Sequence, residues 1–381
     1  MKKIVSLLLC FIVLASATLL FSCGDNKYDD IEFVETPYAG STLYVYNWGE
    51  YIADGSDGSK DIIKIFEKKY DITVKYSYFI SNEEMYTQIK NGASYDIIIP
   101  SDYMIDRLIN ENLIQKIDLS NIPNYSNIAD EYKNLYFDEN NEYSVPYNVG
   151  MVGIIYNKEM VDASDAAQQS WSLMWNSKYK NNVVNFNNSR DAFGTAQYLL
   201  GLDVNSKDEA DWQAAYDKLF EQKNSVQPAY LMDEIYNKME NENSAIAAYY
   251  AGDCLQMMQE NENLAFYYPT EGTNIFVDSM CIPTAAKNKG AAELFINFML
   301  DTEIAVENAN YLCYASPNKT VWDNENYDYR KGTDEYEILY NIPESYQNDQ
   351  TKMQYFHDLS TEAPEIQNLL TKLWTQLGIE E

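Results

Sequence analysis

Two aromatic residues and one carboxylate lie close together near the start of the chain. Residues 43–46 are apolar or aromatic and predict a short buried strand. Trp48, Glu50 and Tyr51 then surround Gly49, where we expect a turn. An acid held against aromatic faces suits an organic cation, because the carboxylate neutralises the charge while the rings cover the methylenes. The alternative is that the two rings fill a core edge and the acid is a solvated turn residue.

The elements that would position these residues alternate between strand and helix patterns. Strands are expected at residues 43–46, 72–79 and 95–100, and helices at 60–70, 82–91 and 102–112. This order predicts a mostly parallel sheet covered by helices on both faces. Ligands bind such sheets beyond the carboxyl ends of the strands. Glu50, Ser81, Ser101 and Tyr103 follow three of these strands and would share one rim.

Catalytic signatures are sparse in this sequence. His357 is its only histidine, and it falls within residues 353–377, which we expect to form a helical tail. There is no nucleophile elbow, phosphate-binding loop or zinc-protease motif. The abundant carboxylates leave a hydrolase with paired carboxylates open. We predict that the protein is not an enzyme and uses no cofactor.

Acidic residues dominate the charge. Lys and Arg number 27 against 59 Asp and Glu, so the formal net charge is −32. This charge disfavours nucleic acid as a partner and favours a cationic ligand, although acidic loops are also typical of a solvated surface.

The N-terminus predicts export. Lys2 and Lys3 precede an apolar run over residues 4–21, which is typical of a signal peptide ending at residue 22. Residues 20–23 resemble a lipobox, which would place a lipid on Cys23 and anchor the protein on the outer face of the cytoplasmic membrane or in the periplasm. Residues 23–40 would form a flexible tether. Cys254, Cys281 and Cys313 are expected to be buried thiols, with a Cys281–Cys313 bridge as an alternative.

Two extended runs later in the chain have features of crossovers between lobes. In residues 143–150 a Pro and a Gly bracket an apolar stretch, and residues 273–282 form a second such stretch. An edge strand with a bulge is the alternative for the first.

Several segments together carry a family resemblance. They are Tyr46-Asn47-Trp48-x-Glu50-Tyr51, Pro100-Ser101-x-Tyr103, Val145-Pro146-Tyr147, Asp278-Ser279 and Tyr314-x-x-Pro317-Asn318. In this order, from about residue 42 to the C-terminus, they resemble the spermidine/putrescine-binding proteins of bacterial ABC importers.

The resemblance implies an α/β, two-lobed, type II periplasmic-binding-protein-like fold, with a mostly parallel sheet flanked by helices in each lobe and the ligand cleft between the lobes. Residues 41–149 and 275–319 would form lobe one, and residues 150–274 and 320–381 lobe two. It implies a monomer that binds putrescine or spermidine reversibly, delivers it to a membrane permease, and touches the membrane through its lipid anchor alone.

The resemblance also implies the ligand-binding residues. They are Trp48, Glu50, Tyr51, Ser101, Tyr103, Asn188, Asp191, Tyr250, Phe276, Asp278, Tyr314 and Phe356. Asp278 and Asp191 would hold the amines. Without the resemblance, Asp191 reads as a helix N-terminal acid, Asp278 as an exposed strand acid and Tyr314 as a core ring.

Four of these positions depart from the family pattern. Asn188 stands where an acid is common, Tyr250 and Phe276 where tryptophan is common, and Phe356 where an amide is common. The lost acid favours putrescine over spermidine, because a buried unpaired ammonium costs several kcal/mol. Alternatives are a receptor of the same fold for ferric iron, a sugar or another organic cation, and a structural adhesin.

Overall fold

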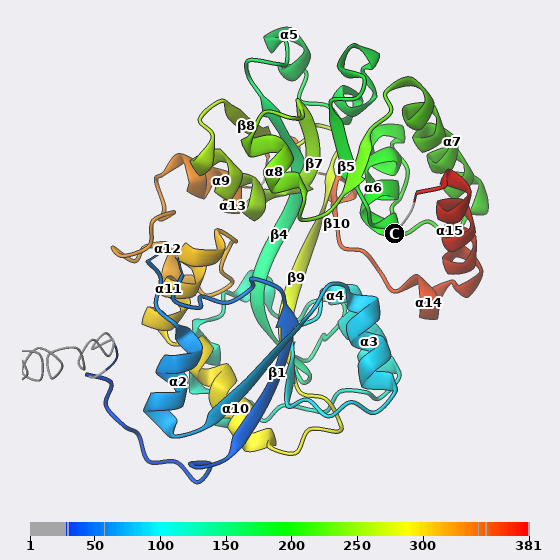
Figure 1. The fold of residues 1–381 in the computed structure, drawn as a ribbon. Helices are drawn as coiled ribbons and strands as arrows, with labels where there is room; N and C mark the ends of the chain where they lie inside the picture. Colours follow the sequence, from blue (N-terminus) through cyan, green and yellow to red (C-terminus); the bar gives the residue numbers. More distant parts are fainter. Residues whose placement is uncertain (1–27, 29, 57, 342, 347–348, 380–381) are drawn as a thin grey trace, which may run out of the picture.

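Two lobes joined by long strands make up the fold. The computed structural model describes Tyr28 and residues 30–56, 58–341, 343–346 and 349–379 (Figure 1). The first lobe contains β1 (Thr42–Trp48), α2 (Ile62–Tyr70), β2 (Thr73–Phe79), α3 (Asn82–Lys90), β3 (Ile97–Ile98), α4 (Asp102–Asn110), α10 (Lys289–Met299) and α11 (Thr302–Leu312). The second contains β5 (Val183–Phe186), α6 (Ser189–Leu200), α7 (Glu209–Ser225), β6 (Ala229–Leu231), α8 (Ile235–Glu240), β7 (Ile246–Tyr250), α9 (Ala251–Glu260) and β8 (Leu264–Tyr267).

Strands β4 (Ser144–Asn157) and β9 (Thr273–Cys281) run through both lobes. The strand order is β2-β1-β3-β9-β4-β7-β5-β6. The first half of β4 pairs with β9, and its second half, from Val152, pairs with β7. The two expected crossovers are therefore continuous strands. Within the first lobe, residues 144–151 of β4 pair with β9 alone among the described strands, so β4 is also an edge strand there, as the alternative expected. A register shift between Pro146 and Asn148 bends β4 within the first lobe.

The parallel sheet predicted for residues 42–100 is confirmed. β1 pairs in parallel with both β2 and β3, and β5 pairs in parallel with β6 and β7. Alternating residues of β1 face different cores, because Val45 belongs to one buried cluster and Tyr46 to the other. Helices cover both faces, as expected of a sheet with apolar residues on each side.

The helix boundaries follow local capping. Asp61 accepts from the Lys64 N–H at the start of α2, and Ser81 accepts from the Glu84 N–H at the start of α3. Each cap satisfies a backbone N–H that has no partner within its helix. The predicted starts of these two helices therefore lie within two residues of the observed ones.

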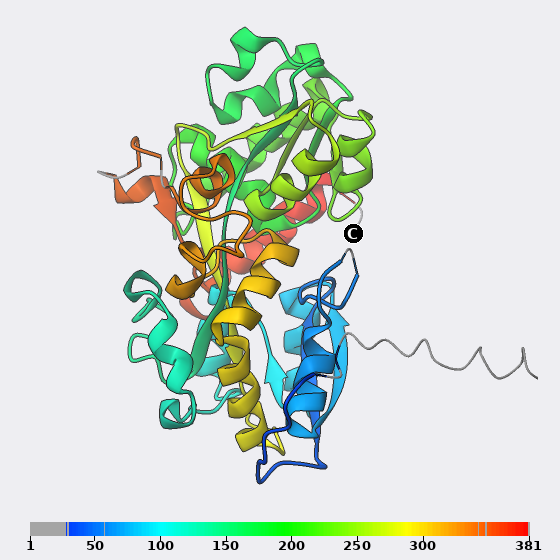
Figure 2. The same cartoon turned by 90° about the vertical axis from the view of Figure 1, so that its left-hand side faces the viewer.

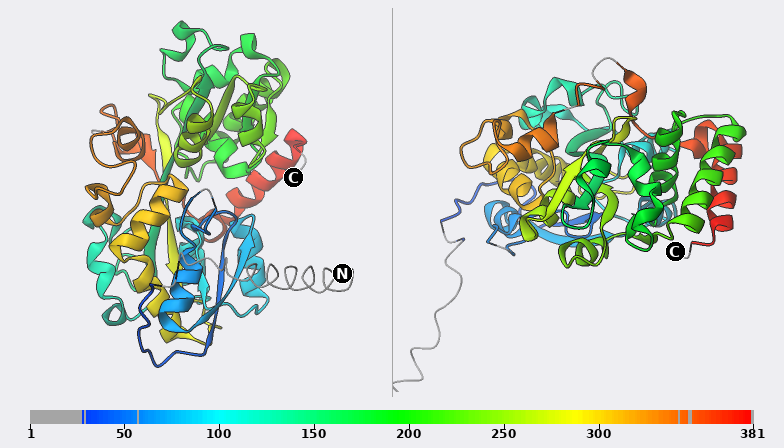
Figure 3. Two further views of the ribbon diagram at one scale, coloured as in Figure 1. Left: turned by 60° about the vertical axis from the view of Figure 1, so that its left-hand side comes forward. Right: turned by 90° about the horizontal axis from the view of Figure 1, so that it is seen from above.

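The C-terminal region differs from the expected single helix over residues 353–377. β10 (Met353–Gln354) pairs with the start of β9, α14 (Leu359–Glu362) is short, and only α15 (Pro364–Leu377) is long. Asp358 caps α14, and Pro364 starts α15 at a position where proline breaks a preceding helix. Figure 3 shows α15 lying along α7 of the second lobe.

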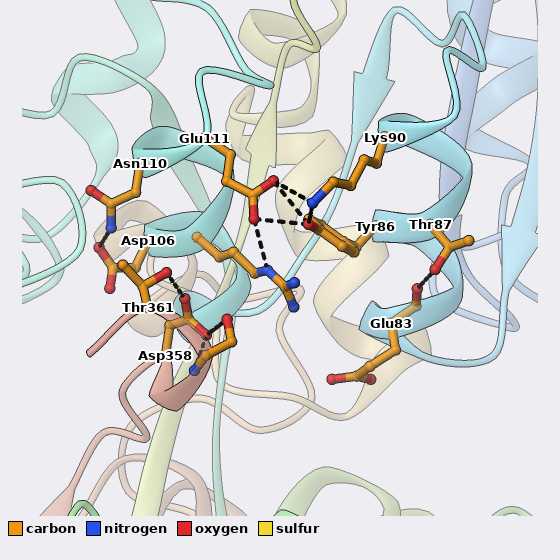
Figure 4. A network of polar contacts seen from close by, with 11 residues as sticks. Glu83, Tyr86, Thr87, Lys90, Asp106, Asn110, Glu111, Asp358 and Thr361 are labelled. Atoms are coloured by element: carbon orange, nitrogen blue, oxygen red, sulfur yellow. Dashed lines mark hydrogen bonds and ion pairs between the residues drawn. The ribbon is translucent and has the colours of Figure 1, made fainter. Parts of the chain in front are cut away.

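The residues just before α14 make a contact between the lobes. Tyr136 of the first lobe donates to the Phe356 carbonyl at 2.6 Å, and its ring stacks on His357 at 4.5 Å. Figure 4 shows Asp106 of α4 beside Asp358 and Thr361. Burial first, and then the charges of Asp358 and Glu362, raise the pKa of Asp106. The lobes therefore meet at the C-terminal segment as well as through their strands.

The remaining described elements are connections. They are α5 (Ala163–Ala166), α12 (Lys319–Trp322), α13 (Asp334–Tyr340) and the 3-10 turns Leu119–Asn121, Pro123–Asn127, Asp130–Tyr132, Trp171–Trp175, Ser177–Tyr179 and Gln350–Lys352. α12 contacts α11, whereas α13 contacts α9. The segment 319–340 therefore touches both lobes, and the exact residue boundaries of the lobes stay a prediction.

The N-terminal segment lies against the first lobe, on the side seen in Figure 2. Tyr28 is buried and its hydroxyl accepts from the Asp61 N–H at 2.9 Å, while the Val34 N–H donates to Lys69. These contacts hold Tyr28 and Val34 against the first lobe, which differs from the flexible tether expected over residues 23–40. The expected signal peptide and the lipidation site Cys23 lie outside the described residues.

The three cysteines of the described chain, Cys254, Cys281 and Cys313, are buried and free. The expectation of buried thiols is confirmed, and the alternative bridge is wrong. Among the described helices, none has the length and apolar character needed to cross a bilayer.

Candidate functional site

Asp278 anchors the candidate site from the middle of β9. Its side chain is 4% exposed, and its Oδ2 accepts a hydrogen bond from the Tyr51 hydroxyl at 2.7 Å. Ser101, at the end of the β3 segment, forms a β-bridge with Asp278. The second oxygen, Oδ1, is buried and has no hydrogen-bond partner among the described residues. A buried acceptor without a partner is costly, so this oxygen is suited to a donor from outside the chain.

The turn after β1 brings Tyr51 to this carboxylate. Glu50 adopts a left-handed conformation with φ 50°, which reverses the chain directly after Gly49. The Tyr51 carbonyl then accepts from Asn47 at 3.1 Å and from the Tyr147 hydroxyl at 2.6 Å. The strand, the turn and β4 therefore fix the Tyr51 ring together.

A row of rings leads from Asp278 to the second lobe. The ring centroids of Tyr51 and Tyr314 are 5.7 Å apart, those of Tyr314 and Phe276 6.4 Å, and those of Phe276 and Tyr250 5.4 Å. All three pairs are edge-to-face, which is a favourable arrangement of aromatic rings. Gly150 makes room for Phe276, because a Cβ at this position would lie 2.2 Å from the ring.

Asp191 lies at the other end of this row. It stands in the first turn of α6, and its Oδ2 accepts from the Tyr250 hydroxyl at 2.8 Å and from Asn188 Nδ2 at 2.9 Å. Asn188 is the N-cap of α6 and accepts from the Arg190 and Asp191 N–H groups. Asp191 is thus both a helix N-terminal acid and a neighbour of the ring row, so the two readings of its role are compatible.

Burial sets the electrostatics of the two acids. It raises the pKa of Asp278 to about 6, against the lowering effects of the Tyr51 hydrogen bond and of the nearby Ser101 hydroxyl. It also raises the pKa of Asp191 to about 6, against the hydrogen bond from Tyr250 and the charge of Arg190. Both carboxylates are ionised at pH 7 at a cost in solvation, which a bound cation would relieve.

Ser101 and Tyr103 are held by α3. Asn82 Nδ2 donates to Ser101 Oγ at 3.2 Å and to the Tyr103 hydroxyl at 3.1 Å, and Tyr103 donates to Glu83 at 3.0 Å. The charge of Asp191, on the opposite lobe, contributes to a raised pKa of Tyr103. This rim of the first lobe therefore lies near the acid of the second.

Three of the expected site residues lie apart from this row. Glu50 is exposed and has no hydrogen bond or ion pair within the described chain. The Trp48 ring packs on Phe79, with centroids 4.6 Å apart. Phe356 is buried in the core of the second lobe, where the Arg190 guanidinium lies 4.3 Å from its ring centroid.

Two polar residues near the row escaped the sequence analysis. Asn148 pairs with Asp278 across the β4–β9 ladder and is 2% exposed. Asp253 lies in the first turn of α9 and accepts from the Tyr314 hydroxyl at 2.9 Å. Asp253 could have been found by the strand-end rule, because it follows β7 by three residues, whereas the role of Asn148 depends on a register that the sequence does not specify.

The arrangement suits reversible binding of an extended cation. Asp278 and Asp191 come from different lobes, and aromatic rings line the path between them. No group of three or more His, Cys, Asp or Glu side chains that could hold a metal occurs in the described residues.

Comparisons with known proteins agree with this description. Residues 93–331 match the family model described as bacterial extracellular solute-binding protein. The chain is 35% identical over 288 residues to the spermidine/putrescine-binding periplasmic protein of Salmonella typhimurium, covering 73% of this chain and 78% of the relative. It is 27% identical over 354 residues to the putrescine-binding periplasmic protein PotF of Escherichia coli, covering 88% and 91%.

A solved structure of the spermidine/putrescine ABC transporter substrate-binding protein PotD from Streptococcus pneumoniae superposes with a TM-score of 0.73. The two chains are 34% identical, and the match covers 89% of this chain and 98% of the other. The expected type II periplasmic-binding-protein fold is confirmed.

Proposed function

The chain belongs to the family of bacterial extracellular solute-binding proteins, and on this premise we propose that it binds putrescine or spermidine and delivers it to the permease of an ABC importer. One observation carries the proposal: two buried acids from opposite lobes, Asp278 and Asp191, are connected by a row of aromatic rings. Relatives named for binding spermidine and putrescine support the same ligand class.

In the proposed mechanism, the ammonium groups pair with the carboxylates and the methylenes lie on the rings. Asp278 Oδ1 would accept from one amine, and Asp191 would face the other. Closure of the lobes then buries the ligand, and the strands β4 and β9 absorb the rotation. The steps are association and release, so the mechanism needs no catalytic residue or cofactor.

Trp48 and Glu50, at the rim, are proposed to reach the amine when the lobes close. The other residues proposed to contact the ligand lie around the row of rings: Tyr51, Ser101, Tyr103, Asn188, Asp191, Tyr250, Phe276, Asp278 and Tyr314. Phe356 supports Arg190 from the core instead. The few carboxylates along the row support putrescine over the longer trication spermidine, because each buried ammonium needs its own compensation.

We also propose that the exported chain is a monomer, anchored through a lipid on Cys23. The apolar run and the lipobox-like residues 20–23 support this location. An anchor of this kind would hold the receptor on the outer face of the cytoplasmic membrane, close to a permease.

Ligand-dependent stabilisation tests the proposal. A chain starting at residue 28 is melted with putrescine, spermidine, a sugar or ferric citrate. Putrescine at a hundred times its dissociation constant should raise the free energy of unfolding by about 2.7 kcal/mol, whereas the sugar and ferric citrate should leave the melting temperature unchanged. A shift with ferric citrate alone would identify an iron receptor instead.

The affinity should fall in acid. A bound ammonium lowers the pKa of Asp278 and Asp191 from about 6, so binding releases protons below this pH. The affinity for putrescine should therefore be constant above pH 7 as far as these two groups are concerned, and should fall by up to about tenfold per pH unit for each acid below pH 6. Calorimetric titrations between pH 5 and 8 would measure this, and equal affinity at pH 5 and 7 would contradict it.

A further inference from the structure

Asp253 is a partly buried carboxyl beside Tyr314 of the row of rings. Tyr314 donates its hydroxyl proton to Oδ2 at 2.9 Å, and the Tyr236 hydroxyl of α8 lies 2.9 Å from Oδ1. The Tyr236 hydroxyl also lies 2.7 Å from Gln256 Oε1. One phenol oxygen therefore touches two acceptors.

The number of protons in this network is limited. Gln256 Nε2 donates to the carbonyls of Tyr311 at 3.2 Å and Leu312 at 3.3 Å, which fixes the amide orientation and leaves Oε1 facing Tyr236. Tyr236 carries one proton and can donate it to Gln256 or to Asp253. All contacts are satisfied together when Asp253 Oδ1 carries a proton and donates it to Tyr236, which then donates to Gln256.

The same network fastens one lobe to the other. The two carbonyls that accept from Gln256 are the last of α11, which have no partner within their helix. Tyr314 follows α11, and its ring lies on α9 at Gly252, where a Cβ would be 2.5 Å from the ring. α9 of the second lobe thus holds both the end of a first-lobe helix and a ring of the candidate site.

The surroundings favour the neutral acid. Burial raises the pKa of Asp253 to about 7, against the hydrogen bonds from Tyr314 and Tyr236, and the charge of Asp233, which precedes α8, raises it further. The other titratable groups that face it are Tyr249 and Tyr250 at the end of β7, Cys254 on α9 and Cys313 after α11. Their pKa values are all raised, so they stay neutral near pH 7 and add no charge there.

We propose that Asp253 is a positioning residue that takes up a proton when it fastens Tyr314 and the end of α11 to α9. This inference rests on the proposed polyamine function, because it makes Asp253 hold a wall of that site through Tyr314. When the lobes separate, Asp253 loses the Tyr314 hydroxyl and Gln256 loses the two first-lobe carbonyls that fix its amide, while Tyr236 stays beside Asp253 on the same lobe. The carboxyl then meets water, where an ordinary Asp is ionised at neutral pH. Closure then costs more as the pH rises towards 7.

The sign is opposite to that of the two ligand-facing acids. Their protonation weakens binding, whereas protonation of Asp253 strengthens it. Asp253→Asn separates the two effects, because an asparagine amide donates to Tyr236 and its oxygen accepts from Tyr314 at every pH. The contributions of Asp191 and Asp278 are the same in both proteins and cancel in the ratio of dissociation constants.

The experiment measures the dissociation constant of putrescine by calorimetry from pH 5.5 to 8.5 for the wild type, Asp253→Asn and the control Asp217→Asn, which removes an exposed acid of α7. The ratio of wild-type to Asp253→Asn dissociation constants should rise at least about tenfold from pH 5.5 to 7.5 and then stay level, since one unit of pKa difference corresponds to a factor of ten. The ratio of wild-type to Asp217→Asn dissociation constants should stay within about twofold of its value at pH 5.5, because exposed charges contribute little. A ratio to Asp253→Asn that is the same at every pH would overturn the inference.

Two further measurements keep the inference testable. If Asp253→Asn does not fold, wild-type titrations at pH 7.0 in phosphate and Tris buffers should reveal net proton uptake on binding, and net release would contradict the inference. If the protein binds no polyamine, the proposed function fails separately. The free energy of unfolding without ligand then decides. Because the pKa of Asp253 is higher in the folded than in the unfolded protein, the wild type should lose stability relative to Asp253→Asn as the pH rises from 5 to 7. If the stabilities of the two proteins changed in parallel with pH, Asp253 would not be protonated in the folded state.

Discussion

Asp278→Asn is expected to lower the affinity for putrescine about 100-fold or more while leaving the fold intact. The carboxylate is buried, and removing the charge from one partner of a buried pair costs about 3–5 kcal/mol. An asparagine oxygen can still accept the Tyr51 hydroxyl, so the native contact at 2.7 Å is kept and the loss comes from the charge. Calorimetry with putrescine would measure the change, and circular dichroism would check the fold.

The matched control for this variant is Asp130→Asn. Asp130 is a first-lobe acid whose side chain is 93% exposed and whose ion pair with Lys133 is on the surface. Its replacement removes the same formal charge and should change the affinity less than about twofold, because exposed pairs contribute little and are screened by salt. Equal losses in both variants would mean that net charge, and not contact with Asp278, sets the affinity.

Asp191→Asn should also lower the affinity for putrescine about 100-fold, for the same electrostatic reason at the opposite end of the ring row. It should, however, leave binding of the monoamine 1-aminobutane through Asp278 within about threefold of the wild type, whereas Asp278→Asn should abolish it. The asparagine can still accept from Tyr250 and Asn188, which hold the wild-type carboxylate at 2.8 and 2.9 Å. Competition titrations of both amines would measure the two effects.

A second-lobe control is Asp217→Asn on α7. Asp217 is exposed and accepts from Gln213 one helical turn away, remote from the ring row. It should bind both amines like the wild type. Unchanged putrescine affinity in Asp191→Asn would restrict Asp191 to its role at the start of α6.

Much of the first lobe could be predicted because its signals are local. The strand periods of residues 43–46 and 72–79 and the caps at Asp61 and Ser81 depend on neighbours within four residues. Strand-end placement also predicted that Ser101 would lie beside the site, although it could not give the bridge to Asp278 on a strand 177 residues later.

Features set by tertiary contacts could not be predicted. β10 forms because Met353 and Gln354 find the free start of β9, and this pairing overrides the helical pattern around them. The left-handed turn at Glu50, which leaves its side chain exposed at the rim, has no signal in the sequence beyond the preceding Gly49. Asp253 was missed because its importance comes from hydroxyls on α8 and after α11, which only the folded chain brings together.

The shared strands also bear on how the chain is synthesised. β9 stands between β3 and β4 in the sheet, yet it follows the whole of the second lobe in the sequence. The first-lobe sheet therefore lacks the strand that joins β3 to β4 until residue 281 has left the ribosome, and nascent chains shorter than this have no complete first domain to fold. Such a chain stays unfolded for longer, which is the state that a secretion channel can transport, because the N-terminal strands complete their sheet only after β9 has been made.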